Sequence, residues 1–166
     1  MKIGIDASRY RYGEATGVEW YSWHIINCLI NELKGGHPED ELILYSREPI
    51  EVLGKVNNRI LATKRFWTLN ALTREIKKNP PDVLFVPSHI LPLSLPKRSV
   101  ITIHDTAFRH LKSAYSFSQY HYLNWSTKYA VKHADKIIVP SQATSKDLQH
   151  FYKCPEDKIT VIHHGF

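Results

Sequence analysis

The sequence lacks two features that would place the protein outside the cell or across a membrane. Only two cysteines, Cys28 and Cys154, occur among 166 residues, too few for a disulfide framework or a cysteine-rich zinc site. No continuous apolar run is as long as a signal-peptide core or a membrane span. We therefore expect a cytoplasmic protein. A chain of this length buries about 70% of its unfolded surface without disulfides or metals.

Acidic residues are also in the minority, with 16 Asp and Glu against 22 Lys and Arg. The segment 55–78 contains seven cations and one acid, and its net charge of +6 equals that of the whole chain. Its cations are Lys55, Arg59, Lys64, Arg65, Arg74, Lys77 and Lys78. We expect peripheral membrane contact through this segment, and its alternative is a solvated helix start. Acidic residues in the preceding stretch, 39–51, disfavour nucleic acid as a partner.

Short apolar runs alternate with longer amphipathic stretches, a pattern typical of α/β proteins. We expect strands at 2–6, 41–45, 59–62, 82–86, 100–104, 136–139 and 160–162. Helices are expected at 18–33, 67–77 and 117–133, with a fourth starting at Ser141, and Ser116 and Gln119 have the spacing of a capping box. Most strands are continuous apolar runs, which predicts a Rossmann-like parallel sheet with helices on both faces. The proline-rich stretch 87–96 is expected to be a loop.

Polar residues follow several of these strands. In open parallel sheets, ligands bind beyond the carboxyl ends of the strands. His104 and Asp105 follow the run at 100–103, and Ser88 and His89 follow the run at 82–86. An imidazole and a carboxylate at such an edge are candidates for hydrogen bonds to a substrate. In the alternative, His104 is a partly buried histidine bonded to backbone, and Asp105 caps the next turn.

The loop after the first strand is a second candidate site. It ends at Gly17, which opens the helix that continues with Val18. The free N–H groups and the positive end of a helix dipole there favour an anion. Arg9 and Tyr10, earlier in the loop, are suited to a sugar or a phosphate. The alternative for Gly17 is a simple turn glycine. The missing G-x-G-x-x-G fingerprint disfavours a nicotinamide enzyme.

No metal site is expected. His163 and His164 directly follow the expected strand 160–162, and as neighbours continuing a strand their side chains would point to opposite faces of the sheet and could not share one ion. No other His, Asp or Glu cluster has a metal-ligand spacing, and neither a nucleophile elbow nor a P-loop occurs.

Five blocks, taken in order, resemble the group 1 (family 4) retaining glycosyltransferases. They are GIDASRY at 4–10, TGVE at 16–19, TIHD at 102–105, ADKIIVPS at 134–141 and KITVIHHG at 158–165. The resemblance implies a two-domain B-type fold, with residues 1–166 as the amino-terminal, acceptor-side domain. It also implies that a carboxy-terminal domain absent from this sequence binds most of the donor.

The resemblance further implies roles for the candidate residues. Gly17 and Val18 would approach the donor diphosphate, His104 would lie beside the transferred sugar, and Asp105 would support its loop. The acceptor would contact four residues: Arg9, Tyr10, Ser88 and His89.

The implied activity is transfer of a hexose from a nucleotide sugar to a saccharide or lipid-linked acceptor. GDP-mannose is the expected donor, and no metal or other cofactor is expected. Such an enzyme would act in surface polysaccharide synthesis at the inner face of the membrane, and the isolated domain would be inactive. Two alternatives are a non-catalytic Rossmann-like binding module and one subunit of a split transferase.

Overall fold

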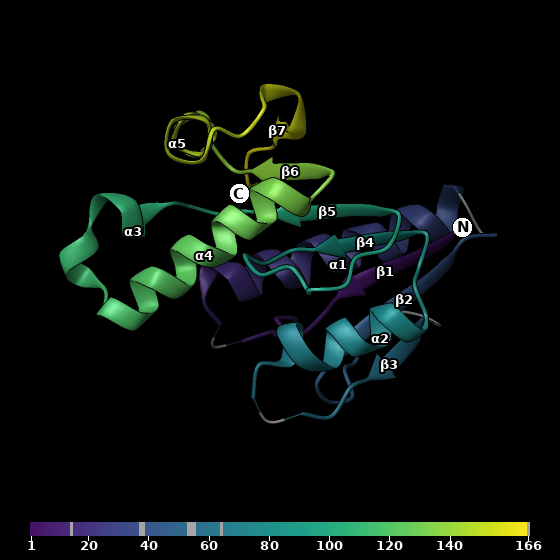
Figure 1. The fold of residues 1–166 in the computed structure, drawn as a ribbon. Coiled ribbons are helices and arrows are strands. Elements are labelled where there is room, and N and C mark those ends of the chain that lie inside the picture. The colour runs from purple at the N-terminus through teal and green to yellow at the C-terminus, as the bar shows by residue number, and fades with distance from the viewer. Residues whose placement is uncertain (14, 37–38, 53–55, 64, 166) are drawn as a thin grey trace. The chain divides into compact units, whose positions relative to one another are not determined.

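The computed structural model describes residues 1–13, 15–36, 39–52, 56–63 and 65–165. They form two compact units. Unit 1 comprises Met1–Ser88 and Pro92–Ser99, and unit 2 comprises His89–Leu91 and the chain from Val100 onward. Figure 1 shows the course of the chain through the labelled elements.

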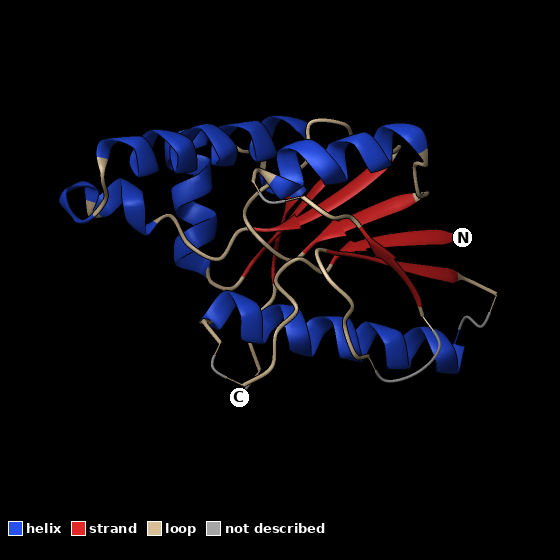
Figure 2. Ribbon diagram, turned by 90° about the horizontal axis from the view of Figure 1, so that it is seen from below, coloured by secondary structure: helices blue, strands red, loops and turns tan. Residues whose placement is uncertain are grey.

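Unit 1 contains four parallel strands in the order β3-β2-β1-β4. The strands are β1 (Lys2–Asp6), β2 (Glu41–Ser46), β3 (Asn57–Ile60) and β4 (Val83–Val86), and the helices are α1 (Gly17–Gly36), the π-helix η1 (Thr68–Leu72) and α2 (Thr73–Lys78). Helices α1 and α2 lie on opposite faces of these strands (Figures 1 and 2). The core between them is fully buried at Ile5, Leu44 and Leu84 of the strands and at Ile26 of α1.

Unit 2 contains three parallel strands in the order β5-β6-β7. They are β5 (Arg98–Thr102), most of which belongs to this unit, β6 (Lys136–Val139) and β7 (Ile159–Val161). Its helices are α3 (Ala107–His110), α4 (Phe117–His133) and α5 (Gln142–Tyr152), with 3₁₀ turns η2 (Lys112–Ala114) and η3 (Glu156–Lys158). The expected α/β, Rossmann-like fold class is confirmed.

The local signals at two helix starts are also confirmed. Ser116 Oγ accepts the N–H of Gln119, and Gln119 Oε1 accepts the N–H of Ser116, so the capping box is complete. Ser141 is the N-cap of α5, and its side chain accepts the N–H of Thr144. The stretch 87–96 contains no helix or strand.

Three strands begin and end earlier than the apolar pattern indicates. Strand β3 covers 57–60 instead of 59–62, because Asn57 pairs with Ile43 of β2. Strand β7 ends at Val161, one residue before the expected end. Strand β5 ends at Thr102 instead of His104, because the N–H of His104 donates to the side chain of His89. The expected helix 67–77 begins as a π-helix at Thr68.

Candidate functional site

In unit 1, a cavity of about 190 Å³ opens where β1 and β2 end and α1 begins. It is lined by Ala7, Ser8, Arg9, Tyr10, Arg11, Glu19, Ser46, Arg47, Glu48 and Ile50. Three guanidinium groups and two carboxylates therefore border one small space. This composition suits a polar ligand that carries negative charge, because a guanidinium group binds phosphate or carboxylate through paired N–H donors.

The first helical turn of α1 is held by Glu19. Its Oε2 accepts the N–H of Thr16 at 2.9 Å and the hydroxyl of Thr16 at 3.0 Å. These bonds, led by the one from the backbone, lower the pKa of Glu19. Arg9 lies 3.9 Å from the other oxygen of Glu19. A ligand anion at this helix start would therefore share Arg9 with a carboxylate of the chain.

Gly17 and Val18 open α1 as expected, and Gly17 is exposed. A Cβ at residue 17 would meet no heavy atom within 4 Å among the described residues, apart from its chain neighbours and the adjacent backbone of α1. Packing within the described part of the chain therefore does not require glycine here, and the backbone at this position faces open space.

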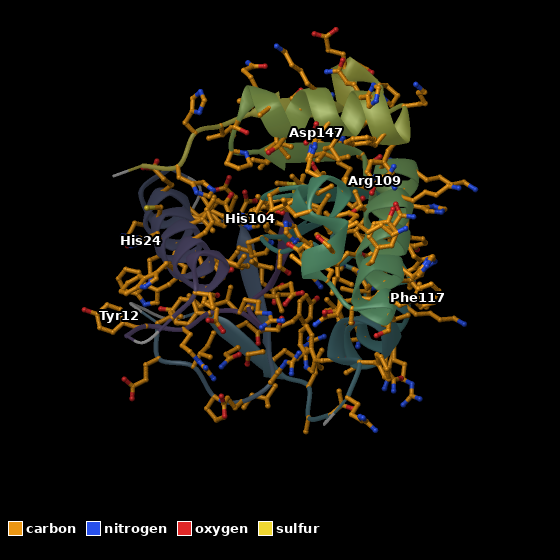
Figure 3. The ribbon with its side chains drawn as sticks, turned by 90° about the vertical axis from the view of Figure 1, so that its left-hand side faces the viewer. Tyr12, His24, His104, Arg109, Phe117 and Asp147 are labelled. Carbon is orange, nitrogen blue, oxygen red and sulfur yellow. The ribbon has the colours of Figure 1, made fainter. Side chains whose placement is uncertain are left out.

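Tyr10 is bound within unit 1 through its phenol. The hydroxyl donates to the carbonyl of Glu51 at 3.1 Å and accepts from Asn27 Nδ2 at 3.1 Å. Its ring lines the small cavity and also a wider groove of about 620 Å³. Trp23 and the exposed Tyr12, labelled in Figure 3, also line this groove, with ring centroids 5.0 Å apart. A charged pocket thus adjoins an aromatic surface.

Asp6 ends β1 directly before the loop of this cavity. The side chain is buried, and burial raises the pKa of its carboxyl. One oxygen accepts the N–H of Ser8 at 2.9 Å, and the other has no hydrogen-bond partner among the described residues. Asp6 therefore anchors the start of the loop that carries Arg9.

In unit 2, His104 is fixed through its backbone. Its N–H donates to Nε2 of His89 at 2.7 Å, and its carbonyl accepts from the hydroxyl of Thr144 at 3.4 Å. The imidazole ring lies 5.3 Å from the ring of His89 and 5.5 Å from that of His164, between centroids. The half-buried His104 (Figure 3) is thus held between two other histidines just beyond β5.

His89 acts here as a hydrogen-bond acceptor. Because its Nε2 accepts an N–H, the proton of the neutral ring must be on Nδ1. Burial, reinforced by the neighbouring His104, lowers the pKa of His89 from 6.5 to about 4. At neutral pH, His89 is therefore an uncharged support for the backbone of His104.

Asp105 is exposed, and its Oδ1 accepts the N–H of Ala107 at 2.9 Å. This bond is the turn-capping contact that the sequence left open as an alternative. The next residue, Thr106, donates its hydroxyl to Asp147 at 2.6 Å, and His110 contacts the same carboxylate oxygen at 2.7 Å. Asp147 thereby ties the loop after β5 to helix α5 (Figure 3).

Strand β7 ends at Val161 and does not extend to His163 and His164, so, contrary to expectation, these two residues are not strand neighbours. His163 Nδ1 lies 3.0 Å from the carbonyl of Pro140 and, facing an oxygen that only accepts, donates to it. Ser88 is half-buried, follows β4 and belongs to unit 1. In the described part of the chain, no three or more His, Cys, Asp or Glu residues are grouped so that they could hold a metal ion.

A profile of Glycosyltransferase Family 4 matches residues 22–166. The chain belongs to this family. The expected resemblance to family 4 glycosyltransferases is thus confirmed at the level of the family. A search of curated proteins found no match.

A crystal structure of a glycosyltransferase from Rickettsia africae ESF-5 is similar to the chain, with 15% sequence identity and a TM-score of 0.49. The similarity covers 99% of this chain and 43% of that one. The chain therefore spans less than half the length of that glycosyltransferase.

Sequence reasoning missed two features of this Glycosyltransferase Family 4 chain. Arg47 and Glu48 line the unit 1 cavity although neither was a candidate. They directly follow β2, so the rule that ligands bind beyond strand ends would have found them. The contact between the rings of His104 and His164 is the second. It joins residues 60 positions apart in the sequence, so no local sequence pattern predicts it.

Across the described residues, no helix is long and apolar enough to cross a membrane. The basic segment 55–78 is described only in part, because Lys55 and Lys64 lie outside the described residues. Arg59 forms an ion pair with Glu75, and Lys77 and Lys78 are exposed on the last turn of α2.

Proposed function

We propose that this chain is the acceptor-side domain of a retaining glycosyltransferase. The observation that carries the proposal is the family match over residues 22–166. In this proposal the enzyme moves a hexose from a nucleotide sugar to a saccharide or lipid-linked acceptor. A second domain binds most of the donor, and the isolated chain is inactive.

In the proposed reaction, the bond between the anomeric carbon and the donor diphosphate breaks, and the acceptor oxygen bonds to that carbon on the same face. The electron pair of the broken bond leaves with the diphosphate oxygen, the acceptor's hydroxyl proton passes to this diphosphate, and the nucleoside diphosphate departs. The enzyme must stabilise the departing diphosphate and hold the acceptor oxygen in place. The amino terminus of α1, at Gly17 and Val18, supplies N–H donors for the diphosphate. No metal is needed in this scheme.

His104 is the proposed catalytic residue, with its imidazole beside the transferred sugar. The contacts of its N–H with His89 and of its carbonyl with Thr144 support this role, because a residue held on both sides keeps its ring in place. Asp105 supports the same loop by capping the turn at Ala107.

The proposed acceptor site uses the loop after β1. Arg9 and Tyr10 line the charged cavity, and the aromatic groove beside it contains Tyr12 and Trp23. An acceptor with a sugar ring next to a phosphate or carboxylate fits this pairing. Ser88 and His89 are the other proposed acceptor contacts, although His89 already uses Nε2 to hold His104.

Three further proposals concern the donor, the pathway and the location of the enzyme. A mannosyl donor such as GDP-mannose, a role in surface polysaccharide synthesis and a position at the inner face of the membrane follow from the resemblance of the sequence blocks. Lys77 and Lys78 of segment 55–78 are exposed, so this segment is a proposed contact with lipid headgroups.

A donor screen on the full-length protein that carries this chain tests the proposal. Release of UDP, GDP or ADP is followed for each nucleotide sugar, with and without simple acceptors. Release of one nucleotide that increases with an acceptor is the expected result. In the same assay, His104→Ala should lower turnover roughly 100-fold without a matching loss of stability. His150→Ala, a change at an exposed histidine of α5, serves as the control.

An unchanged rate in His104→Ala would remove that residue from the mechanism. No release from any donor, by protein shown to be folded, would instead favour a binding module or a subunit of a split transferase. A downstream domain with paired glutamates in the parent protein would argue against both alternatives.

A further inference from the structure

Helix α4 exposes several of its large aromatic side chains and buries mostly small residues. The buried residues of this helix are Ser126, Thr127, Ala130 and Val131. Phe117 is 80% exposed and Trp125 is 43% exposed. A helix that only packs onto a sheet buries its large apolar side chains, so this arrangement is inverted.

Exposed and half-buried aromatic side chains form a stripe along α4. It consists of Phe117, His121, Tyr122, Trp125, Tyr129 and His133, most of them four residues apart. Ring centroids are 4.2 Å apart for Phe117 and His121, 5.7 Å for Trp125 and Tyr129, and 4.4 Å for Tyr129 and His133. Figure 3 labels Phe117, which begins the stripe. The stripe is thus as long as the helix itself.

The charge around the stripe has one sign. From residue 107 to residue 134 the sequence contains no Asp or Glu, whereas it contains Arg109, Lys112, Lys128 and Lys132. Arg109 is used internally, because it donates to Tyr120 and Asn124. The three lysines are exposed. This face therefore has positive charge and no carboxylate of its own helix to balance it.

We propose that the α4 stripe docks on an anionic lipid surface. Tyrosine and tryptophan are enriched where proteins meet the membrane–water interface, and lysines beside them attract anionic headgroups. A protein partner would fit less well, because protein interfaces are depleted of lysine. Leu111, the C-cap of α3, is also 60% exposed.

This surface differs from the basic segment 55–78, and it does not depend on the proposed reaction. Binding to lipid is measured without donor or acceptor, so the outcome of the donor screen does not affect it.

The test is sedimentation with vesicles of equal parts phosphatidylcholine and phosphatidylglycerol, compared with phosphatidylcholine alone, at low and high salt. Salt-sensitive binding to the anionic vesicles only is expected. The double variant Lys128→Gln/Lys132→Gln should weaken binding about 30-fold. Phe117→Ser/Trp125→Ser should weaken it about tenfold or more.

The matched control is Lys146→Gln/Lys153→Gln, which removes two exposed lysines from α5 and its C-cap and should leave binding unchanged. The pair Lys77→Gln/Lys78→Gln removes two exposed lysines from the last turn of α2, the other proposed lipid contact, and should weaken binding less than the α4 pair. Circular dichroism checks that each variant is folded. If the aromatic variant does not fold, the lysine pairs of α4 and α2 still decide the question.

Three results would overturn the proposal. The first is no binding to anionic vesicles at low salt. The second is weaker binding in the α2 pair with no change in the α4 pair, which would move lipid contact to segment 55–78. The third is a dimer, seen by sedimentation velocity, that the aromatic variant converts to monomer while lipid binding is unchanged. That result would make the stripe an interface between copies.

Discussion

Protonation of His89 should destabilise the fold. The N–H of His104 donates to Nε2 of His89 at 2.7 Å, so Nε2 can take a proton only when this hydrogen bond breaks. In the folded chain the pKa of His89 is lowered from 6.5 to about 4. The unfolded chain therefore binds a proton at mildly acidic pH that the folded chain cannot bind.

The sign and size of the effect follow from this difference. The stability from neutral His89 is fully present above about pH 6.5 and is lost as the pH falls towards about 4. A tenfold difference in proton affinity corresponds to about 1.4 kcal/mol. The loss therefore approaches about 3 kcal/mol, a large part of the stability of an ordinary domain.

Two substitutions separate the hydrogen bond from the titration. His89→Leu removes the acceptor and should lower the free energy of unfolding by about 1–3 kcal/mol at neutral pH. His89→Gln keeps an acceptor oxygen and should cost less. Both should reduce the difference in stability between about pH 7 and about pH 5. Urea unfolding, followed by tryptophan fluorescence, measures all of these values.

His133→Gln, a change at an exposed histidine of α4, should leave the pH dependence of the wild type in place. If His89→Gln showed the same loss of stability towards low pH as the wild type, His89 would not be the titrating support of His104. The pKa of His89 would then not be lowered by its burial and its contact with His104.

Two further predictions concern packing and capping. Gly4→Ala should cost about 1–3 kcal/mol in urea unfolding, because the new Cβ would lie 2.8 Å from a ring carbon of Tyr45; an unchanged midpoint would contradict this close approach. Ser116→Ala should lower stability by about 1 kcal/mol in thermal unfolding through loss of the capping box. The neighbouring Ser118→Ala should have the smaller effect, and equal effects would argue against the box.

The sequence by itself determined the fold class, the order of the elements and several exact boundaries. Strands β1 and β6 and helix α4 were predicted residue for residue, because a short isoleucine-containing run or a capping box specifies each of them locally. The strand-end rule placed His104 and Asp105 just beyond β5. These features depend on neighbours in sequence, and the sequence contains that information directly.

Tertiary structure decided what depends on residues far apart in the chain. Strand β5 ends at Thr102 because His89, fifteen residues before His104, accepts its N–H. Arg47 joins the loop after β1 in one cavity because β2 pairs with β1. The aromatic residues of α4 recur with the period of a helix, but only packing decides which face of that helix is buried. Local pattern gives a helix its period, whereas the contacts of the folded chain give it its orientation.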